Sequence, residues 1–144
     1  MLRLDGTWAK HDEGQAVRQL RQLGPAFADW LLVLFQKSKR LQPRCSAVFY
    51  ATPCARVSKA AIQIGTLAVF DKSMKVRFRG CELLAYSLRP DVVRTLQHAR
   101  KVAPPAEWPD FDAALDAIAH QNHHYFYDRD HSGKFTWDVQ SVDG

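Results

Sequence analysis

A chain of 144 residues is long enough to fold as one domain with a buried core, and we predict a single domain over residues 1–144. Hydrophobic residues make up 47% and charged residues 24% of the chain, which excludes a disordered or fibrous protein. The most apolar run, Ala26 to Phe35, is ten residues long, whereas a membrane-spanning helix needs roughly 20. With no apolar leader behind Met1, we expect a soluble protein without a secretory signal or a membrane partner.

Charge is distributed unevenly along the chain. Residues 1–101 carry 18 Lys and Arg against 7 Asp and Glu, a net charge of +11, and form a basic body. Residues 102–144 carry 2 against 8, a net charge of −6, and form an acidic C-terminal segment. This asymmetry predicts an anionic partner for the basic body, or an acidic segment that folds back and partly neutralises it.

The first part of the chain favours helices. Asp12 to Gln15 has the form of a capping box, and the apolar residues after it recur at three- and four-residue steps. Because Gly24-Pro25 interrupts this pattern, we expect two helices over 12–23 and 25–38, or one helix with a kink. The second helix is apolar nearly all round, so we expect it in the core with Trp30 buried.

The middle of the chain changes to short β-rich runs. The candidate strands span residues 46–51, 61–70, 75–80 and 82–88. Residues 71–73 form a plausible turn, and the strand at 75–80 alternates apolar with basic side chains. These runs predict an antiparallel β-meander with one face packed on the N-terminal helices.

Helices return after residue 88. Arg89-Pro90-Asp91 begins a helix whose exposed face carries Arg94, His98 and Lys101 at steps of four and three, and Ala103 to Pro105 reads as a linker. Pro109 opens another short helix, and residues 134–139 alternate like a final strand. The predicted fold class is therefore α+β, with N-terminal helices on a meander, further helices and a C-terminal β-hairpin.

The stretch HHYFYDRDHSG, residues 123 to 133, admits three interpretations. The candidate metal ligands in this stretch and just before it are His120, His123, His124, Asp128 and Asp130, with His131 as a further ligand. A metalloprotease motif fails because Gln121 occupies the glutamate position. Asp128, Asp130, Ser132 and Gly133 match the start of an EF-hand loop, but Val139 replaces its bidentate glutamate.

Aromatic runs flank a polar turn at residues 131–133, so a hairpin is the third interpretation. We therefore predict a metal-free hairpin over residues 123–139, with no cofactor.

Basic residues of the body are candidates for phosphate contacts. They are Lys75, Arg77 and Arg79 on the predicted strand, and Arg94, His98 and Lys101 on the predicted helix. Neutralising phosphates releases condensed counterions, so such a surface binds nucleic acid without reading its bases. Nearby aromatic rings could stack on exposed bases, namely those of Phe49, Tyr50, Phe70 and Tyr86. The alternative is a solvated charged face with the aromatic residues in the core.

The function predicted first is that of a small, non-enzymatic nucleic-acid-binding protein acting through a basic surface. The alternatives are a protein-interaction module, such as a regulator or inhibitor, and a metal-dependent hydrolase or nuclease using His120, His123, His124, Asp128 and Asp130. Cys45, Cys54 and Cys81 form no C-x-x-C pair, so we expect thiols in a reducing cytoplasm.

Overall fold

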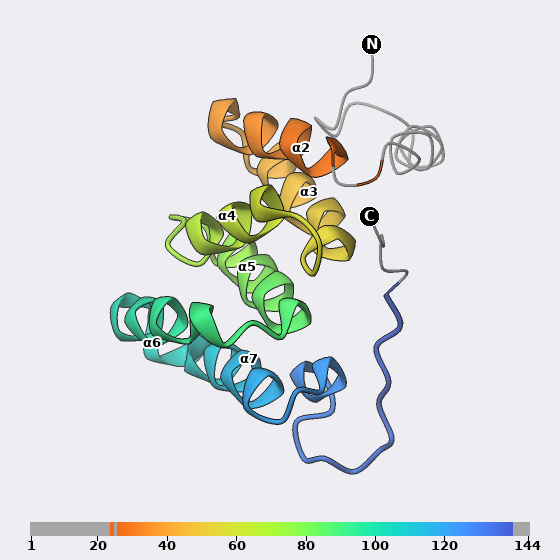
Figure 1. Ribbon diagram of the computed structural model, residues 1–144. Helices are drawn as coiled ribbons and strands as arrows, with labels where there is room; N and C mark the ends of the chain where they lie inside the picture. Colours follow the sequence, from red (N-terminus) through yellow and green to blue (C-terminus); the bar gives the residue numbers. More distant parts are fainter. Residues whose placement is uncertain (1–23, 25, 140–144) are drawn as a thin grey trace.

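Every regular element that the structure describes is helical (Figure 1). A computed structural model describes residue 24 and residues 26–139. In chain order, with η for 3₁₀-helices, the elements are α2 (Ala26–Lys37), α3 (Leu41–Ala51), η1 (Thr52–Cys54), α4 (Lys59–Ala68), α5 (Met74–Ser87), η2 (Pro90–Val92), α6 (Val93–Val102), η3 (Pro105–Glu107), α7 (Trp108–Ala119) and η4 (His123–Phe126). Among the described helices, none combines the length and the apolarity needed to cross a bilayer. The predicted helix over 12–23 and its capping box lie outside the described residues.

The α-helices pair into hairpins α2–α3, α4–α5 and α6–α7, which stack on one another (Figure 1). α2 packs against α4, α3 against α5, and α5 against α7. This is the arrangement of a short α-solenoid, in which each helix pair contacts mainly its neighbours. Stacking places the turns within the hairpins along one edge, at the left of Figure 1, and the connections between hairpins at the opposite edge.

The predicted α+β fold with a β-meander is wrong, because the described residues contain no strand. The expected strand at 46–51 lies in α3, the one at 61–70 covers most of α4, and those at 75–80 and 82–88 share α5. Short apolar runs fit a buried helix as well as a buried strand, so the sequence pattern alone does not separate the two. The buried residues of α4 follow a helical period, namely Ala60, Ala61, Ile64, Gly65 and Ala68.

Two glycines explain how α4 and α5 pack so closely. A Cβ atom added at Gly80, in the middle of α5, would lie 2.9 Å from both the Cβ of Ala68 and the backbone nitrogen of Val69. One added at Gly65 would lie 2.7 Å from the end of the Leu83 side chain. Gly80 resembled the end of a strand in the sequence, but its role is to let a neighbouring helix approach.

The remaining predicted helices are confirmed in outline. The helix expected over 25–38 is α2, the helix after Arg89 is η2 followed by α6, and the helix opened by Pro109 is α7. The expectation that α2 is buried all round is wrong. Its inner face is buried, but Trp30 is 37% and Val33 46% exposed.

The predicted C-terminal hairpin is also wrong. Residues 123–126 form the 3₁₀-helix η4, and residues 127–139 contain no strand. The aromatic side chains that suggested cross-strand pairs pack on the helices instead: Phe126 is fully buried against Phe78, and Trp137 contacts Tyr86 edge-on. Burying these rings against preformed helices removes more apolar surface from water than an isolated ribbon could.

Candidate nucleic-acid interface

Arg44, in the first turn of α3, joins the first two hairpin turns. Its Nη2 donates to Asp71 Oδ2 at 2.6 Å, and its Nη1 donates to the backbone oxygen of Lys39 at 2.9 Å. The side chains of Arg44 and Asp71 are 8% and 12% exposed, so this ion pair is largely withdrawn from solvent. The α2–α3 turn is therefore fixed to the α4–α5 turn.

Arg77 joins the second turn to the third in the same way. Its Nε and Nη2 donate to the two carboxylate oxygens of Glu107 at 2.7 and 2.8 Å, and its Nη1 donates to the backbone oxygen of Asp71 at 2.8 Å. The hydrogen bond to Glu107 raises the pKa of the Arg77 guanidinium. A guanidinium has five N–H donors, and Arg77 uses three of its nitrogens for hydrogen bonds within the protein. We therefore regard Arg77 as a structural residue rather than a free phosphate contact.

Arg79 is likewise engaged by neighbouring side chains, although its own side chain is 36% exposed. Its Nη1 lies 3.1 Å from the carboxylate of the buried Glu82, and its guanidinium stands 4.8 Å from the ring centre of Phe49. Glu82 also accepts a hydrogen bond from the Tyr127 hydroxyl, and burial together with this bond raises the pKa of Tyr127. Lys75 lies one turn earlier on α5 and is exposed.

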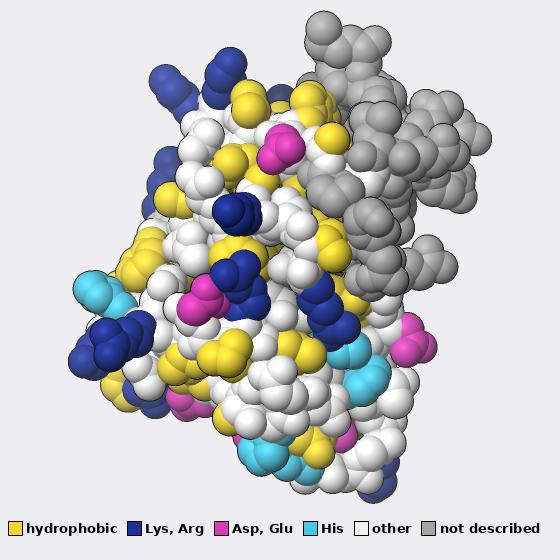
Figure 2. Space-filling model, in the orientation of Figure 1, with side chains coloured by type: hydrophobic (Ala, Val, Ile, Leu, Met, Phe, Trp, Pro, Cys, Tyr) yellow, Lys and Arg dark blue, Asp and Glu magenta, His cyan; other side chains and the backbone are white. Residues whose placement is uncertain are grey.

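The other cations of the hairpin edge project into solvent, and we call this set the basic edge. It comprises Lys37, Lys39, Arg40, Lys72, Lys75 and Lys101, together with His98. None of these six Lys and Arg has an ion-pair partner among the described residues. Arg94 is exposed too, but it lies at the start of α6, near the connection between the second and third hairpins. Figure 2 shows Lys and Arg side chains along the left edge, over the ends of α2, α4 and α6, with a histidine among them.

A groove of about 640 Å³ separates the first two turns on this edge. Its lining combines both charge and apolar surface, and includes Phe35, Lys39, Arg44, Leu67, Phe70 and Lys72. The ring of Phe70 is 47% exposed and meets His98 of α6 edge-on, with 5.4 Å between ring centres. The groove and this contact connect all three hairpins in one surface.

The four aromatic residues predicted to stack on bases have different environments. Tyr86 is buried, with Arg56 over its ring, and Phe49 lies under Arg79. Tyr50 is half-buried and contacts Phe49 edge-on. Phe70 alone of the four lies on the basic edge.

The acidic segment does fold back on the basic body. Glu107 pairs with Arg77, and Asp112 pairs with Arg100 at 2.7 Å. These two carboxylates pair with Arg77 and Arg100, which do not belong to the basic edge. The positive charge of the exposed lysines on that edge is therefore not neutralised by them.

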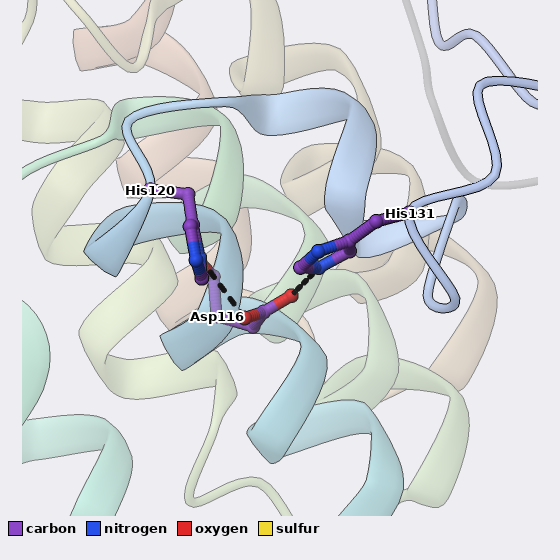
Figure 3. A group of neighbouring side chains, drawn as sticks. All are labelled: Asp116, His120 and His131. Carbon is purple, nitrogen blue, oxygen red and sulfur yellow. Dashed lines mark hydrogen bonds and ion pairs between the residues drawn. The ribbon is translucent and has the colours of Figure 1, made fainter.

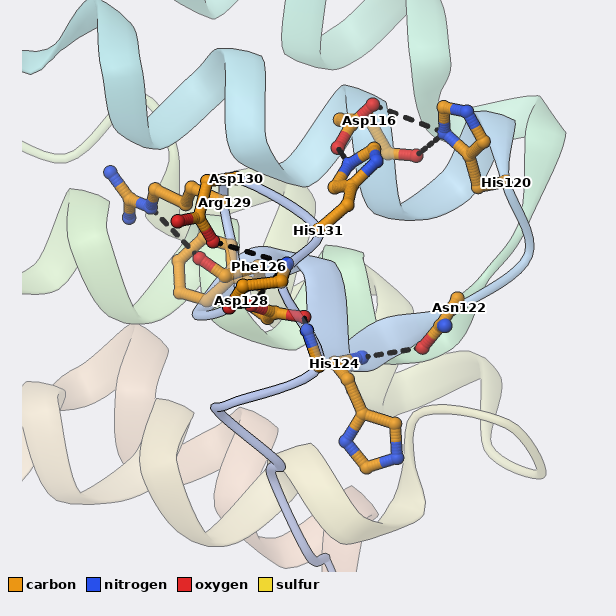
Figure 4. A network of polar contacts seen from close by, with 11 residues as sticks. Asp116, His120, Asn122, His124, Phe126, Asp128, Arg129, Asp130 and His131 are labelled. Atoms are coloured by element: carbon orange, nitrogen blue, oxygen red, sulfur yellow. Dashed lines mark hydrogen bonds and ion pairs between the residues drawn. The ribbon is translucent and has the colours of Figure 1, made fainter.

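The predicted metal candidates do not converge on one point (Figure 4). His123 Nε2 lies 2.8 Å from the backbone oxygen of Trp137, and His124 Nδ1 accepts from the Trp137 backbone N–H at 2.7 Å. Figure 4 shows the His124 ring pointing away from Asp116 and His131. These two histidines hold the C-terminal segment against the helices.

Asp128 organises the loop that follows η4. Its carboxylate accepts hydrogen bonds from the Ser132 backbone N–H, the Ser132 hydroxyl and the Gly133 backbone N–H. Burial opposes its charge, but these hydrogen bonds outweigh burial and lower the pKa of Asp128. Asp130 also accepts from the Ser132 N–H, at 3.2 Å. Both carboxylates therefore shape the loop.

A different trio lies close together among the described residues: Asp116, His120 and His131 (Figure 3). One ligand atom from each lies within 4.8 Å of the others. Asp116 stands one helical turn before His120, and this i, i+4 spacing could have identified it. His120 and His131 are ligand candidates from the sequence, whereas Asp116 precedes the histidine-rich stretch and is not among the predicted ligands.

The chain matches no protein-family model, and comparison with curated proteins and with solved structures finds no significant match.

Proposed function

We propose that this protein binds nucleic acid through its basic edge, without catalysing a reaction. The observation that carries the proposal is the groove between the first two hairpin turns, where an exposed aromatic ring lies among cations. Phe70 lines this groove together with Lys39 and Lys72, and His98 contacts the ring from α6. Of the six residues expected to contact phosphates, Lys75, His98 and Lys101 are exposed and belong to this surface, whereas Arg94 is exposed at the other end of α6.

The charge on this edge suits a phosphate backbone. Exposed lysines bind phosphates as point charges, and each neutralised phosphate releases condensed counterions. Packed helices lie about 8–10 Å apart, so a nucleic-acid strand that crosses the hairpin turns would meet a cation at each turn. The buried Arg44 and Arg77 pairs hold the turns in place, which limits the ordering cost of binding.

The exposed ring of Phe70 favours a single strand over a duplex. Bases in a duplex are stacked on one another, whereas those of a single strand are free to stack on an aromatic side chain. The edge contact with His98 restricts how the Phe70 ring can move. We therefore infer that the ligand is a single-stranded segment of DNA or RNA.

Fluorescence anisotropy with a labelled oligonucleotide of about 20 nucleotides tests the proposal. The double variant Lys39→Gln, Lys72→Gln should bind at least about tenfold more weakly, and its salt slope should fall by about 1.4, or roughly 0.7 per lost single-strand contact. Lys59→Gln is the matched control, because Lys59 is an exposed lysine at the opposite end of α4 from the groove. It should bind like the wild type.

The role of the ring is tested separately. Phe70→Ala should weaken single-strand binding by about 1–3 kcal/mol and leave the salt slope unchanged, because stacking releases no counterions.

Equal affinity of wild type and the double lysine variant would refute the proposal. If the protein instead bound another protein at a fixed stoichiometry, and added oligonucleotide did not compete, the function would be that of a protein-interaction module.

We also propose a cytoplasmic location. The thiols of Cys45 and Cys81 are not in disulfides, and burial raises the pKa of both. Thiols of this kind persist in a reducing compartment. Microscopy of the tagged full chain tests this location directly.

A further inference from the structure

We infer that Asp116, His120 and His131 form a Zn²⁺-binding site at the end of α7. The site goes beyond nucleic-acid binding, because the end of α7 lies at the opposite side of the hairpin stack from the basic edge (Figure 1). Its ligands come from two segments: Asp116 from the last turn of α7 with His120 as its C-cap, and His131 from the loop after η4.

The three side chains contact one another through hydrogen bonds that a shared cation would replace, and His120 Nδ1 also lies 3.0 Å from the Asp116 backbone oxygen. Asp116 Oδ1 lies 3.1 Å from His120 Nδ1, and Asp116 Oδ2 lies 2.6 Å from His131 Nε2. Ligand atoms around tetrahedral zinc stand about 3.3 Å apart, given bonds of about 2.0–2.1 Å. One ligand atom of each residue lies within 4.8 Å of the others, and the short Asp116–His131 contact would lengthen toward the tetrahedral spacing around a shared ion (Figure 3).

His131 is held in position by its neighbours. Its ring stacks on Tyr125 with 3.8 Å between ring centres, and its backbone N–H donates to the Asp128 backbone oxygen at 3.1 Å. Its φ of 56° is a left-handed conformation that L-residues rarely adopt. The contacts of the loop must therefore offset the backbone strain at His131. The Asp128 carboxylate closes this loop from within, as Figure 4 shows. The loop thus holds the His131 imidazole beside the Asp116 carboxylate, where both could serve one ion.

The donor set selects the class of ion. Two imidazoles and one carboxylate suit zinc, whereas calcium and magnesium prefer oxygen ligands alone. Three protein ligands leave the fourth tetrahedral position to water. A surface cavity lined by Asp112, Arg129 and Pro109 adjoins Asp116 and His131, so solvent can reach that position.

Isothermal titration of the chelator-treated full chain with zinc chloride tests the site. We expect binding of one Zn²⁺ and a rise in Tm with zinc that chelator reverses. Because losing even an outer-shell partner typically costs 10- to 100-fold, Asp116→Asn and His131→Ala should each lower zinc affinity roughly 100-fold or more. His98→Ala is the matched control, since His98 is an exposed histidine on the basic edge, and it should bind zinc like the wild type.

Two further measurements keep the test decisive. Circular dichroism verifies that each variant is folded, and Co²⁺ in place of zinc should give the strong visible absorption of a tetrahedral site. Absence of 1:1 zinc binding, or equal zinc affinity in wild type and folded Asp116→Asn, would overturn the inference. In that case the trio is only a hydrogen-bonded connection between α7 and the following loop.

Discussion

Arg77→Gln should destabilise the protein strongly, although the residue belongs to a run of basic side chains that reads as a surface. The substitution removes two hydrogen bonds to Glu107 and one to the Asp71 backbone. It also leaves the Glu107 carboxylate, 9% exposed, without its cation. Breaking a buried ion pair by removing one partner costs about 3–5 kcal/mol. Because Arg77 itself is 15% exposed and solvent can partly replace it, we expect about 3 kcal/mol.

Urea unfolding followed by circular dichroism measures this loss. The midpoint should fall with an unchanged slope, and a loss of about 3 kcal/mol should lower Tm by roughly 10 °C. Lys75→Gln is the matched control, because Lys75 lies two residues away, is exposed and has no ion-pair partner among the described residues. It should change stability by less than about 0.5 kcal/mol. If the two variants were equally stable, the buried pair would not be holding the second and third turns together.

Two other predictions concern packing and pH. Helix propensity alone would make Gly80→Ala stabilising by about 1 kcal/mol, but its Cβ would meet the Val69 backbone, so we expect a net loss of about 1–2 kcal/mol by urea unfolding. Gly65→Ala should cost less, since its Cβ meets only ends of leucine side chains; a gain at Gly80 would contradict the close helix approach. Burial lowers the pKa of His123 in the folded state, despite its hydrogen bond to Trp137, so the unfolded chain binds more protons there. The stabilisation that the neutral His123 gives the folded state is complete above about pH 6.5 and is lost as pH falls through the folded pKa. Urea unfolding at several pH values should therefore show that the free energy of unfolding depends less steeply on pH in His123→Gln. An identical pH dependence in that variant would exclude His123 as the source.

The features that the sequence determined by itself are local ones. Pro90-Asp91 and Pro109-Asp110 begin helices because proline and an acidic side chain suit the first helical turn wherever it lies. Arg94, His98 and Lys101 share an exposed helix face because that follows from a 3.6-residue period. The contrast between basic body and acidic segment is likewise a property of composition.

The class of the middle elements was decided by tertiary packing. The runs between residues 46 and 88 were short, and the one at 75–80 alternated apolar with basic side chains, so both strand and helix remained compatible with them. Helix won because Gly65 and Gly80 let α4 and α5 approach closely and bury their apolar faces on each other. The meaning of a glycine inside a helix depends on the helix that faces it, which no local pattern contains.

The candidate sites also depended on partners distant in sequence. Arg77 became structural because Glu107, 30 residues later, reaches it, and Asp116 gained a ligand partner because the loop carrying His131 returns to α7 15 residues later. Charge type and spacing can propose which residues are able to bind a phosphate or a metal ion. Which of them remain free to do so is decided by folding, because a buried charge must be paired and the pairing residue is brought into place only by the tertiary structure.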